Sequence, residues 1–573
     1  MRIPPYWIRA GVVGLFFISL FGGLAARVTH LQLGDHAELR SSYQRKVVFQ
    51  TRLQGGRGRI LDRNQRVLAL DETRKNIGID PQFIHRHNDP QRVQAALSRF
   101  LRVEPALIGT RMADRDSQFY SLEKYVEDAR ATELDAYLTE NSLRKGVVFQ
   151  KVKTRTYPHG NLLAHVVGFE NREGVGSAGI EYEMNRFLVG KGGLRVGQKD
   201  GNRREMVSRR QVQIDPQDGA DVVLTVDQYL QYGVEEALEK AMSMYNAKGA
   251  WAVVMDSRTG GILAMASKPD YDLNTFYSTS PELFRNHALG ATYEPGSIIK
   301  PLVFAAAMNE GLVDPDEMID CEQGVWMHRN RPLRDYHPYA ELSAADVLKK
   351  SSNIGTAKIG LRLHPHAVHA YYQKFGLGRK TGIDLPGEET GISHHPRNWD
   401  SLTHSRISIG HAITVTAMQM AAALNVIAND GKWIQPYIVS EVKATDGTLL
   451  YKRQPDPQGT RVLRSDVART MRRLMARITE DGGTGRRARF GEYAVAGKTG
   501  TAEKVLPGGG YAKEKNIASF AGFFPAENPV LTIVVSIDEP TGDLRTGGSV
   551  AAPVFAEIGE YAAGYLTIPV EGF

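Results

Sequence analysis

The stretch Glu294-Pro295-Gly296-Ser297-Ile298-Ile299-Lys300, followed by the apolar residues PLVFAAA at positions 301–307, sets the fold and the chemistry of this chain. The apolar run predicts a buried helix that begins near Ser297. A serine and a lysine three residues apart share one face of a helix, so Lys300 can reach the Ser297 hydroxyl. Helix dipoles favour a developing oxyanion at this end, and we expect burial and nearby cations to lower the pKa of Lys300. The stretch predicts Ser297 as nucleophile and Lys300 as base, although Ser-x-x-Lys alone is also typical of a capped helix with an exposed lysine.

A second polar motif, Ser351-Ser352-Asn353, lies 54 residues after Ser297 and follows Lys349-Lys350. A hydroxyl and an amide two residues apart, in a turn between helices, can point into the same cleft. We expect Ser351 to relay a proton and Asn353 to hold a substrate amide carbonyl. By itself the motif is equally typical of a polar helix cap.

A third motif, Lys498-Thr499-Gly500-Thr501, lies 147 residues after Ser351 and follows a short apolar segment. On a strand edge, Gly500 allows close approach of another backbone. Lys498 supplies a positive charge and Thr499 a hydroxyl for a substrate carboxylate. The backbone N–H of Thr501 would join that of the nucleophile in an oxyanion hole.

The same motif imitates the end of a phosphate-binding loop, in the order Gly497-Lys498-Thr499. That loop needs a glycine five residues before Gly497, and this chain has Glu492 there. Nucleotide binding is therefore excluded.

The order and spacing of the three motifs carry more information than any one of them. Ser-x-x-Lys, a Ser-Asp-Asn-like motif and Lys-Thr-Gly form the set found in penicillin-binding proteins and class A β-lactamases. The set predicts serine acyl transfer. The predicted catalytic residues are Ser297, Lys300, Ser351, Asn353 and Lys498, and the predicted substrate-binding residues are Thr499, Gly500 and Thr501.

Apolar strands at both ends of the region after residue 220 predict the α+β class. One expected hairpin joins residues 250–256 to 262–266, and a second joins 519–524 to 530–537. Between them lie expected helices, which include 298–311, 344–363 and 416–429. We therefore expect an antiparallel sheet that is flanked by helices and closed by strands from both ends of the region.

The one long apolar run is N-terminal. Ala10–Ala26 has no charged residue and is about as short as a spanning helix can be. Arg2 and Arg9 precede it and place the N-terminus in the cytoplasm by the positive-inside rule; a cleaved signal peptide is the alternative. The predicted divisions are a cytoplasmic segment 1–9, a transmembrane helix 10–26, an elongated mixed region 27–220, called the pedestal below, and a catalytic domain 221–573.

Composition narrows the function classes further. The net charge of +7 is spread along the chain, which suits an anionic envelope surface, and no basic stripe interleaved with aromatics indicates nucleic-acid binding. The single cysteine, Cys321, excludes an intrachain disulfide and a Cys-based zinc site. Histidines cluster at 85–87, 364–369 and 394–395 without a matching ligand set, so we expect no metal and no other cofactor.

With these motifs, the chain resembles the class B penicillin-binding proteins, which are D,D-transpeptidases of peptidoglycan. The resemblance covers nearly the whole length, and the chain is most similar to the division-specific, FtsI-like branch. Its segments are Arg57–Asn64 (RGRILDRN), Tyr157-Pro158, 164–168, 179–181, 382–388, 410–416 and 547–555. Two residues depart from the family pattern: Gln65 replaces the usual glycine, and His411 stands where glutamine or tyrosine is expected. We therefore give His411 no catalytic role.

The resemblance implies a mechanism and partners. Ser297 would attack the penultimate D-Ala carbonyl of a stem peptide, and an amine of a second stem would resolve the acyl-enzyme during septal wall synthesis. β-Lactams would acylate Ser297. The implied partners are an FtsW-like or RodA-like glycosyltransferase and other membrane proteins of the division complex, at the inner membrane with the catalytic domain outside the cytoplasm.

Several alternatives remain open. The elongation branch of the same family is the nearest of them. A D,D-carboxypeptidase or a β-lactamase would use the same motifs but is usually shorter and lacks the pedestal, and a β-lactam sensor normally has several membrane spans. A non-enzymatic scaffold could also keep this fold, although all three motifs are intact here.

Overall fold

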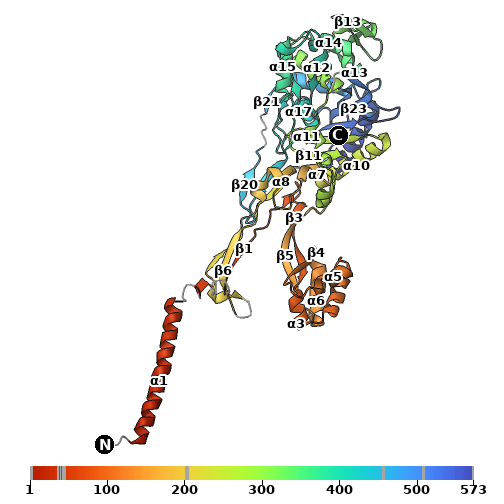
Figure 1. Cartoon of the computed structure of the whole chain (residues 1–573). Helices are drawn as coiled ribbons and strands as arrows, with labels where there is room; N and C mark the ends of the chain where they lie inside the picture. Colours follow the sequence, from red (N-terminus) through yellow and green to blue (C-terminus); the bar gives the residue numbers. More distant parts are fainter. Residues whose placement is uncertain are drawn as a thin grey trace. The chain divides into compact units, whose positions relative to one another are not determined.

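The computed structural model describes residues 4–34, 38, 40–41, 47–200, 205–454, 459–505 and 510–570 (Figure 1). The chain divides into two compact units. The first comprises Met1–Gly56 and Gly190–Gly219, and the second comprises Arg57–Val189 and Ala220–Phe573.

The first unit contains the N-terminal helix and a small sheet. Helix α1 (Pro5–Thr29) continues into one π-helical turn, η1 (His30–Gly34), so the helix is longer than the predicted 10–26 span. Its described apolar side chains are exposed and it is long enough to cross a bilayer, which makes it a candidate membrane anchor. The sheet pairs β1 with β6 and β6 with both β7 and β8. These strands are β1 (Val48–Leu53), β6 (Gly193–Lys199), β7 (Glu205–Met206) and β8 (Val212–Ile214), with the short helix η2 (Val207–Arg209).

In the second unit, a seven-stranded sheet combines strands that are far apart in sequence. Its order is β20-β19-β9-β2-β3-β4, and β5 also pairs with β3. β2 and β9 are parallel, with Ile60 opposite Val222, while the other pairs are antiparallel. The strands are β2 (Ile60–Leu61), β3 (Val67–Ile79), β4 (Tyr120–Glu127), β5 (Val147–Thr156), β9 (Asp221–Leu224), β19 (Val439–Lys443) and β20 (Leu449–Lys452). Residues from both sides of position 220 therefore share one sheet.

Four helices cover the long strands β3, β4 and β5 (Figure 1). They are α3 (Pro81–His87), α4 (Pro90–Phe100), α5 (Pro105–Ala113) and α6 (Asp128–Glu140). The first two begin with an aspartate whose side chain caps the helix and a proline in the first turn, which is why they start where they do. Ile77, Leu97 and Leu134 are fully buried in the core between these helices and the strands.

A buried ion-pair network links two of the sequence landmarks to β5. Glu181, in α8 (Gly179–Glu183), accepts hydrogen bonds from Arg57 Nε at 2.5 Å and from Arg155 Nε at 2.6 Å. Arg57 belongs to the RGRILDRN segment and Arg155 to the end of β5. All three side chains are at most 5% exposed, so each charge depends on the others.

The five-stranded antiparallel sheet of the second unit confirms the predicted α+β class. Its order is β11-β10-β24-β23-β22, so the strands come from both ends of the region, as expected. Helices α10 (Gln228–Tyr245) and α19 (Ala552–Tyr565) cover one face, and α17 (Ala417–Ala428) packs on the other. The strands are β10 (Gly249–Asp256), β11 (Ile262–Lys268), β22 (Ala496–Val505), β23 (Tyr511–Phe524) and β24 (Leu531–Asp538).

The alternation of side chains explains why β10 reads as a continuous apolar run. Ala252 and Val254 join the core under α10 and α19, whereas Val253 and Met255 join the core on the opposite face. A strand buried on both faces needs apolar side chains at every position.

Two helical predictions differ in detail from the structure. The expected 298–311 helix begins as a 3-10 turn, η5 (Gly296–Ile299), and continues as α12 (Lys300–Asn309). The expected 344–363 helix is two helices, α13 (Ala344–Lys350) and α14 (Asn353–Gly360), because Ser351 takes a left-handed conformation with φ 61°. The break between the two helices turns the second motif toward α12.

The remaining described elements of the second unit are short helices and strands that connect these parts. They are α7 (Ala164–Val167), α9 (Asn185–Leu188), η3 (Leu273–Ser278), η4 (Pro281–Phe284), α11 (His287–Gly290), β12 (Met318–Asp320), η6 (Glu322–Gly324), β13 (Val325–His328), β14 (Arg331–Arg334), β15 (Glu341–Ser343), α15 (Pro365–Lys374), β16 (Ile392–Ser393), η7 (Pro396–Asn398), α16 (Thr403–Ile407), β17 (Ile413–Thr414), β18 (Lys432–Trp433), β21 (Thr460–Arg461), α18 (Ser465–Ala476), η8 (Arg486–Ala488) and η9 (Gly547–Ala551).

Candidate active site

Ser297 lies in η5, at the start of a helix that is buried on all sides. Gly296 and Ile298 are buried, whereas Ser297 keeps part of its surface. Gly296 has φ +53°, and its N–H donates to the carbonyl of Gly410 at 3.2 Å. Among the described residues, no hydrogen bond engages Ser297 Oγ. The serine hydroxyl is therefore reachable and uncommitted.

Strand β22 forms the edge of its sheet and runs past η5. A Cβ on Gly500 would lie 2.9 Å from Ile298 Cγ2 and 3.1 Å from the carbonyl oxygen of Pro295. A Cβ on Gly296 would lie 3.3 Å from the carbonyl oxygen of Thr501. Only glycine at these positions lets the two backbones approach this closely. The structure thus brings the backbone beside Ser297 against that of Thr501.

Lys300 is fully buried and its ammonium points to the second motif. Nζ donates to the carbonyl of Ser351 at 2.7 Å, to Ser351 Oγ at 3.2 Å and to Asn353 Oδ1 at 2.8 Å. Burial lowers the pKa of Lys300 to about 7, and the nearby carboxylate of Asp335 opposes part of that effect. In this conformation the described hydrogen bonds of Lys300 go to Ser351 and Asn353 rather than to Ser297.

Ser351 presents two oxygen atoms to this site because of its unusual backbone. It ends α13 in the left-handed region, which non-glycine residues rarely adopt. The turn directs both its carbonyl and its hydroxyl to Lys300. Strained conformations of this kind are concentrated at functional sites.

Lys498 approaches the same hydroxyl from β22. It is 0% exposed, and its Nζ donates to Ser351 Oγ at 2.8 Å and to the Thr499 carbonyl at 3.1 Å. Burial, followed by repulsion from Lys300, lowers the pKa of Lys498. Thr499 Oγ1 donates to Thr484 Oγ1 at 3.1 Å, so its hydroxyl is held beside the lysine. The structure therefore brings together all three predicted motifs.

Asp335 is a residue of this site that the sequence analysis did not find. It follows β14, and its carboxylate accepts from Ser352 Oγ at 2.6 Å and from the backbone N–H groups of Asn353 at 2.5 Å and Ile354 at 3.0 Å. It thus caps α14 from outside the helix and fixes the second motif. No local signal marks it, since only the tertiary fold brings this loop to the helix start.

A second polar cluster lies beside the nucleophile. Glu294 is 9% exposed, and its carboxylate faces His411 Nδ1 at 2.8 Å, the Tyr511 hydroxyl at 3.0 Å and the Ala412 N–H at 2.9 Å. Burial raises the pKa of Glu294, but these three donors outweigh it and the net pKa is lowered. Burial and the Glu294 carboxylate raise the pKa of Tyr511 to about 12. The cluster keeps a carboxylate charged next to an imidazole.

A pocket of about 590 Å³ joins this cluster to the second motif. Asn353 lines one part of it and Glu294, His411 and Tyr511 another, with Arg406 also in the wall. The pocket is therefore continuous with the predicted site.

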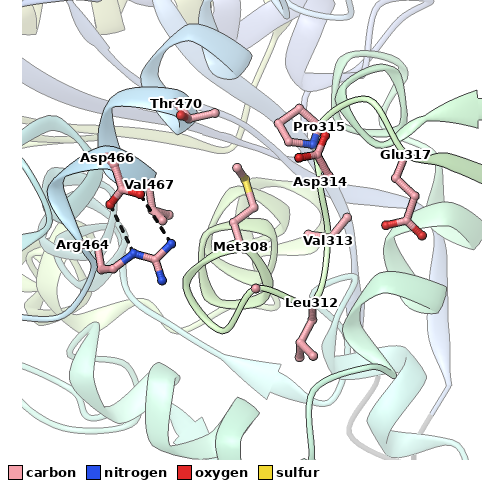
Figure 2. A pocket seen from close by; sticks show the side chains of 11 residues that line it. Met308, Leu312, Val313, Asp314, Pro315, Glu317, Arg464, Asp466, Val467 and Thr470 are labelled. Carbon is pink, nitrogen blue, oxygen red and sulfur yellow. Dashed lines mark hydrogen bonds and ion pairs between the residues drawn. The ribbon is translucent and has the colours of Figure 1, made fainter.

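The other pockets and histidine clusters lie elsewhere. The pocket in Figure 2, of about 430 Å³, lies past the end of α12 and is lined by Met308, Glu317 and the ion-paired Arg464 and Asp466, without any residue of the three motifs. The rings of His366 and His369 each lie 5.4 Å from that of His395. Across the described residues, no group of histidine, cysteine and acidic side chains is arranged to hold a metal ion.

A serine at the start of a buried helix, with two buried lysines around a second hydroxyl, is the arrangement of a serine acyltransferase. The sequence matches the family model of the penicillin binding protein transpeptidase domain over residues 250–560 and that of the penicillin-binding protein dimerisation domain over residues 52–224. The chain belongs to the penicillin-binding protein transpeptidase family, which confirms the resemblance drawn from its motifs.

Individual relatives agree with this assignment over nearly the full length. The probable peptidoglycan D,D-transpeptidase PenA of Neisseria meningitidis is 33% identical over 552 residues, which cover 96% of this chain and 91% of PenA. The peptidoglycan D,D-transpeptidase FtsI of Escherichia coli is 30% identical over 560 residues, 96% of this chain and 90% of FtsI. Penicillin binding protein 3 of Mycobacterium tuberculosis, crystallised with aztreonam, superposes with a TM-score of 0.71 at 26% identity and covers 91% of this chain and 98% of that one.

Proposed function

We propose that this chain is a peptidoglycan D,D-transpeptidase that cross-links stem peptides through an acyl-enzyme on Ser297. The observation that carries the proposal is the convergence of Lys300 and Lys498 on Ser351, beside a partly exposed serine at a helix start. The substrate class follows from the relatives, whose names describe peptidoglycan D,D-transpeptidases.

In the first half-reaction, Ser297 Oγ attacks the carbonyl carbon of the penultimate D-Ala of a donor stem. The Oγ–C bond forms and the serine proton passes to neutral Lys300. The backbone N–H groups of Ser297 and Thr501 stabilise the oxyanion. The C–N bond to the terminal D-Ala then breaks, and Ser351 passes the proton that Lys300 took up to the departing amine.

Donor binding uses the remaining motif residues. Asn353 holds an amide of the donor peptide, while Lys498 and Thr499 bind its terminal carboxylate. Gly500 lets the donor backbone run close to β22. Two lysines in a buried site favour an anionic substrate group, because neither has a carboxylate partner among the described ion pairs. An acceptor amine resolves the acyl-enzyme, and β-lactams acylate Ser297 and stall there.

The division of labour along the chain is also a proposal. Residues 1–9 would be cytoplasmic, 10–26 would span the inner membrane, 27–220 would form the pedestal and 221–573 the transpeptidase domain outside the cytoplasm. The resemblance to the FtsI-like branch supports a role in septal wall synthesis with an FtsW-like partner. Co-purification that yields only a RodA-like glycosyltransferase would instead assign the chain to elongation.

A fluorescent penicillin tests the enzymatic proposal directly. The full-length chain in detergent should become covalently labelled, and the S297A variant should not. Incubation with a D-Ala-D-Ala peptide and an acceptor amine then separates transfer from hydrolysis by product analysis. An unlabelled wild-type chain would reject the proposal, and labelling with hydrolysis as the only outcome would favour a carboxypeptidase.

A further inference from the structure

The cluster of Glu294, His411 and Tyr511 has no part in the acylation steps, yet several hydrogen bonds and a strained backbone fix its geometry. The carboxylate of Glu294 receives three donors and holds Ala412 in a left-handed conformation with φ 59°. Such strain persists only where the surroundings fix it. The result is an imidazole whose position is set by a charged carboxylate.

The hydrogen bonds also fix the tautomer of His411. Nδ1 of His411 lies 2.8 Å from Glu294 Oε2 and 3.0 Å from the Tyr511 hydroxyl oxygen. The charged carboxylate can only accept, so Nδ1 carries the proton. Nε2 is left as the acceptor nitrogen, and no hydrogen bond within the described part of the chain engages it. The side chain is 35% exposed and lines the same pocket as Asn353. A carboxylate-oriented imidazole with one free acceptor is the arrangement of a general base.

The position of His411 relative to the nucleophile is fixed by the backbone. Its neighbour Gly410 accepts the N–H of Gly296 at 3.2 Å, and a Cβ on Gly410 would lie 2.1 Å from the Gly296 carbonyl oxygen. Glu294 precedes Ser297 by three residues. His411 and Ser297 therefore lie on two segments whose backbones pack directly against each other.

We propose that this pocket receives the acceptor amine and that His411, oriented by Glu294 and Tyr511, accepts its proton. The inference rests on the transpeptidase function proposed above. An acceptor amine arrives as an ammonium and cannot attack until it is deprotonated. One proton passes to His411 Nε2, and the free amine attacks the carbonyl carbon of the acyl-enzyme. The C–N bond forms, the C–Oγ bond breaks, and the second amine proton returns through Lys300 to Ser297 Oγ. His411 then releases its proton to water.

The charges around His411 suit this role. Arg406 lines the pocket and acts to lower the pKa of Tyr511, whereas Glu503 acts to raise it. Asp400 also lies in the pocket wall. Arg406 has no carboxylate partner among the described ion pairs, and a cation near the acceptor favours the neutral amine. Glu294 counterbalances it by stabilising the imidazolium that forms.

The test compares transfer with acylation in the full-length chain. The donor is an acyl-D-alanyl thioester and the acceptor is a D-amino acid such as D-methionine; penicillin acylation reports on the folded site and on the first half-reaction. In H411Q, we expect the ratio of aminolysis to hydrolysis to fall at least tenfold. Any fall in the acylation rate should be at least tenfold smaller than the fall in this ratio. H411Y serves as a second variant, and H366Q, at an exposed histidine on α15, as the matched control.

The outcomes are separable. An unchanged ratio of aminolysis to hydrolysis in both H411Q and H411Y, or a parallel fall of acylation and transfer, would overturn the role of His411 while leaving Ser297 as the nucleophile. Failure of the wild-type chain to react with penicillin would instead overturn the proposed function. The H366Q control should match the wild type in every measurement.

Discussion

Lys498 Nζ donates a 2.8 Å hydrogen bond to Ser351 Oγ, and Lys300 donates to the same hydroxyl at 3.2 Å. A hydroxyl oxygen has two lone pairs, so Ser351 can accept both donors at once. Two ammonium groups around one buried oxygen repel each other, which disfavours the state in which both are charged. The two lysines therefore titrate as a coupled pair, and a substrate carboxylate changes the balance between them.

The pH dependence of acylation should report this coupling. Burial lowers the pKa of Lys300 to about 7, and only its neutral form can accept the proton of Ser297. The second-order rate of penicillin acylation should therefore rise about tenfold per pH unit below 7 and level off above about pH 8. Stopped-flow fluorescence from pH 5.5 to 9 measures it. A rate that is level across this range would exclude Lys300 as the base.

Asp335 should matter both for stability and for that pH profile. D335N removes the charge that caps α14 and that raises the pKa of Lys300. We expect a loss of about 1–2 kcal/mol in the free energy of unfolding, as for other charged helix caps. The pH range over which the acylation rate rises should move to lower pH, because the pKa of Lys300 falls when the negative charge is lost.

D446N is the matched control for this substitution. Asp446 is an exposed aspartate that caps the turn between β19 and β20, and its carboxylate accepts the N–H of Thr448 at 2.8 Å. Its replacement should leave the pH dependence of the acylation rate unchanged. The free energy of unfolding should change by no more than about 0.5 kcal/mol. If D335N and D446N behave alike, Asp335 does not position the second motif.

Gly500 should tolerate no side chain. In G500A the new Cβ would meet Ile298 Cγ2 at 2.9 Å and the Pro295 carbonyl oxygen at 3.1 Å, which pushes η5 away from β22. The oxyanion N–H groups would then separate, and loss of one such donor costs about 100- to 1,000-fold in rate. We expect penicillin acylation to fall by at least tenfold. G564A, in α19 with nothing within 4 Å of the new Cβ, should react like the wild type.

Sequence patterns predicted the antiparallel sheet, its two hairpins and the three motifs, because these depend on local order. Strands β10 and β11 are neighbours in sequence, and the motif residues occupy fixed positions on a helix start, a turn and a strand. Asp335 and the Glu294–His411 contact could not be predicted this way. Glu294 and His411 are 117 residues apart, and their meeting depends on how whole elements pack. The pairing of β2 with β9, across position 220, escaped prediction for the same reason.

The buried network around Glu181 gives the last prediction. In E181Q, the guanidinium groups of Arg57 and Arg155 lose their main carboxylate while remaining at most 5% exposed. Asp71, 3.3 Å from Arg155, and Glu170, 3.5 Å from Arg57, compensate only in part. Breaking a buried ion pair from one side costs about 3–5 kcal/mol, so the melting temperature should fall by several degrees.

The control for Glu181 is E317Q, which breaks an ion pair with Arg362 in which both side chains are about a third exposed. Their N–O distance of 2.7 Å is close to the 2.5 and 2.6 Å of the buried pairs, so burial is the main difference. Exposed pairs contribute about 0–1 kcal/mol, and the melting temperature of E317Q should stay close to that of the wild type. Circular dichroism melts of both variants decide the point. Equal shifts in the two variants would contradict the prediction, because burial would then not strengthen the Glu181 ion pairs.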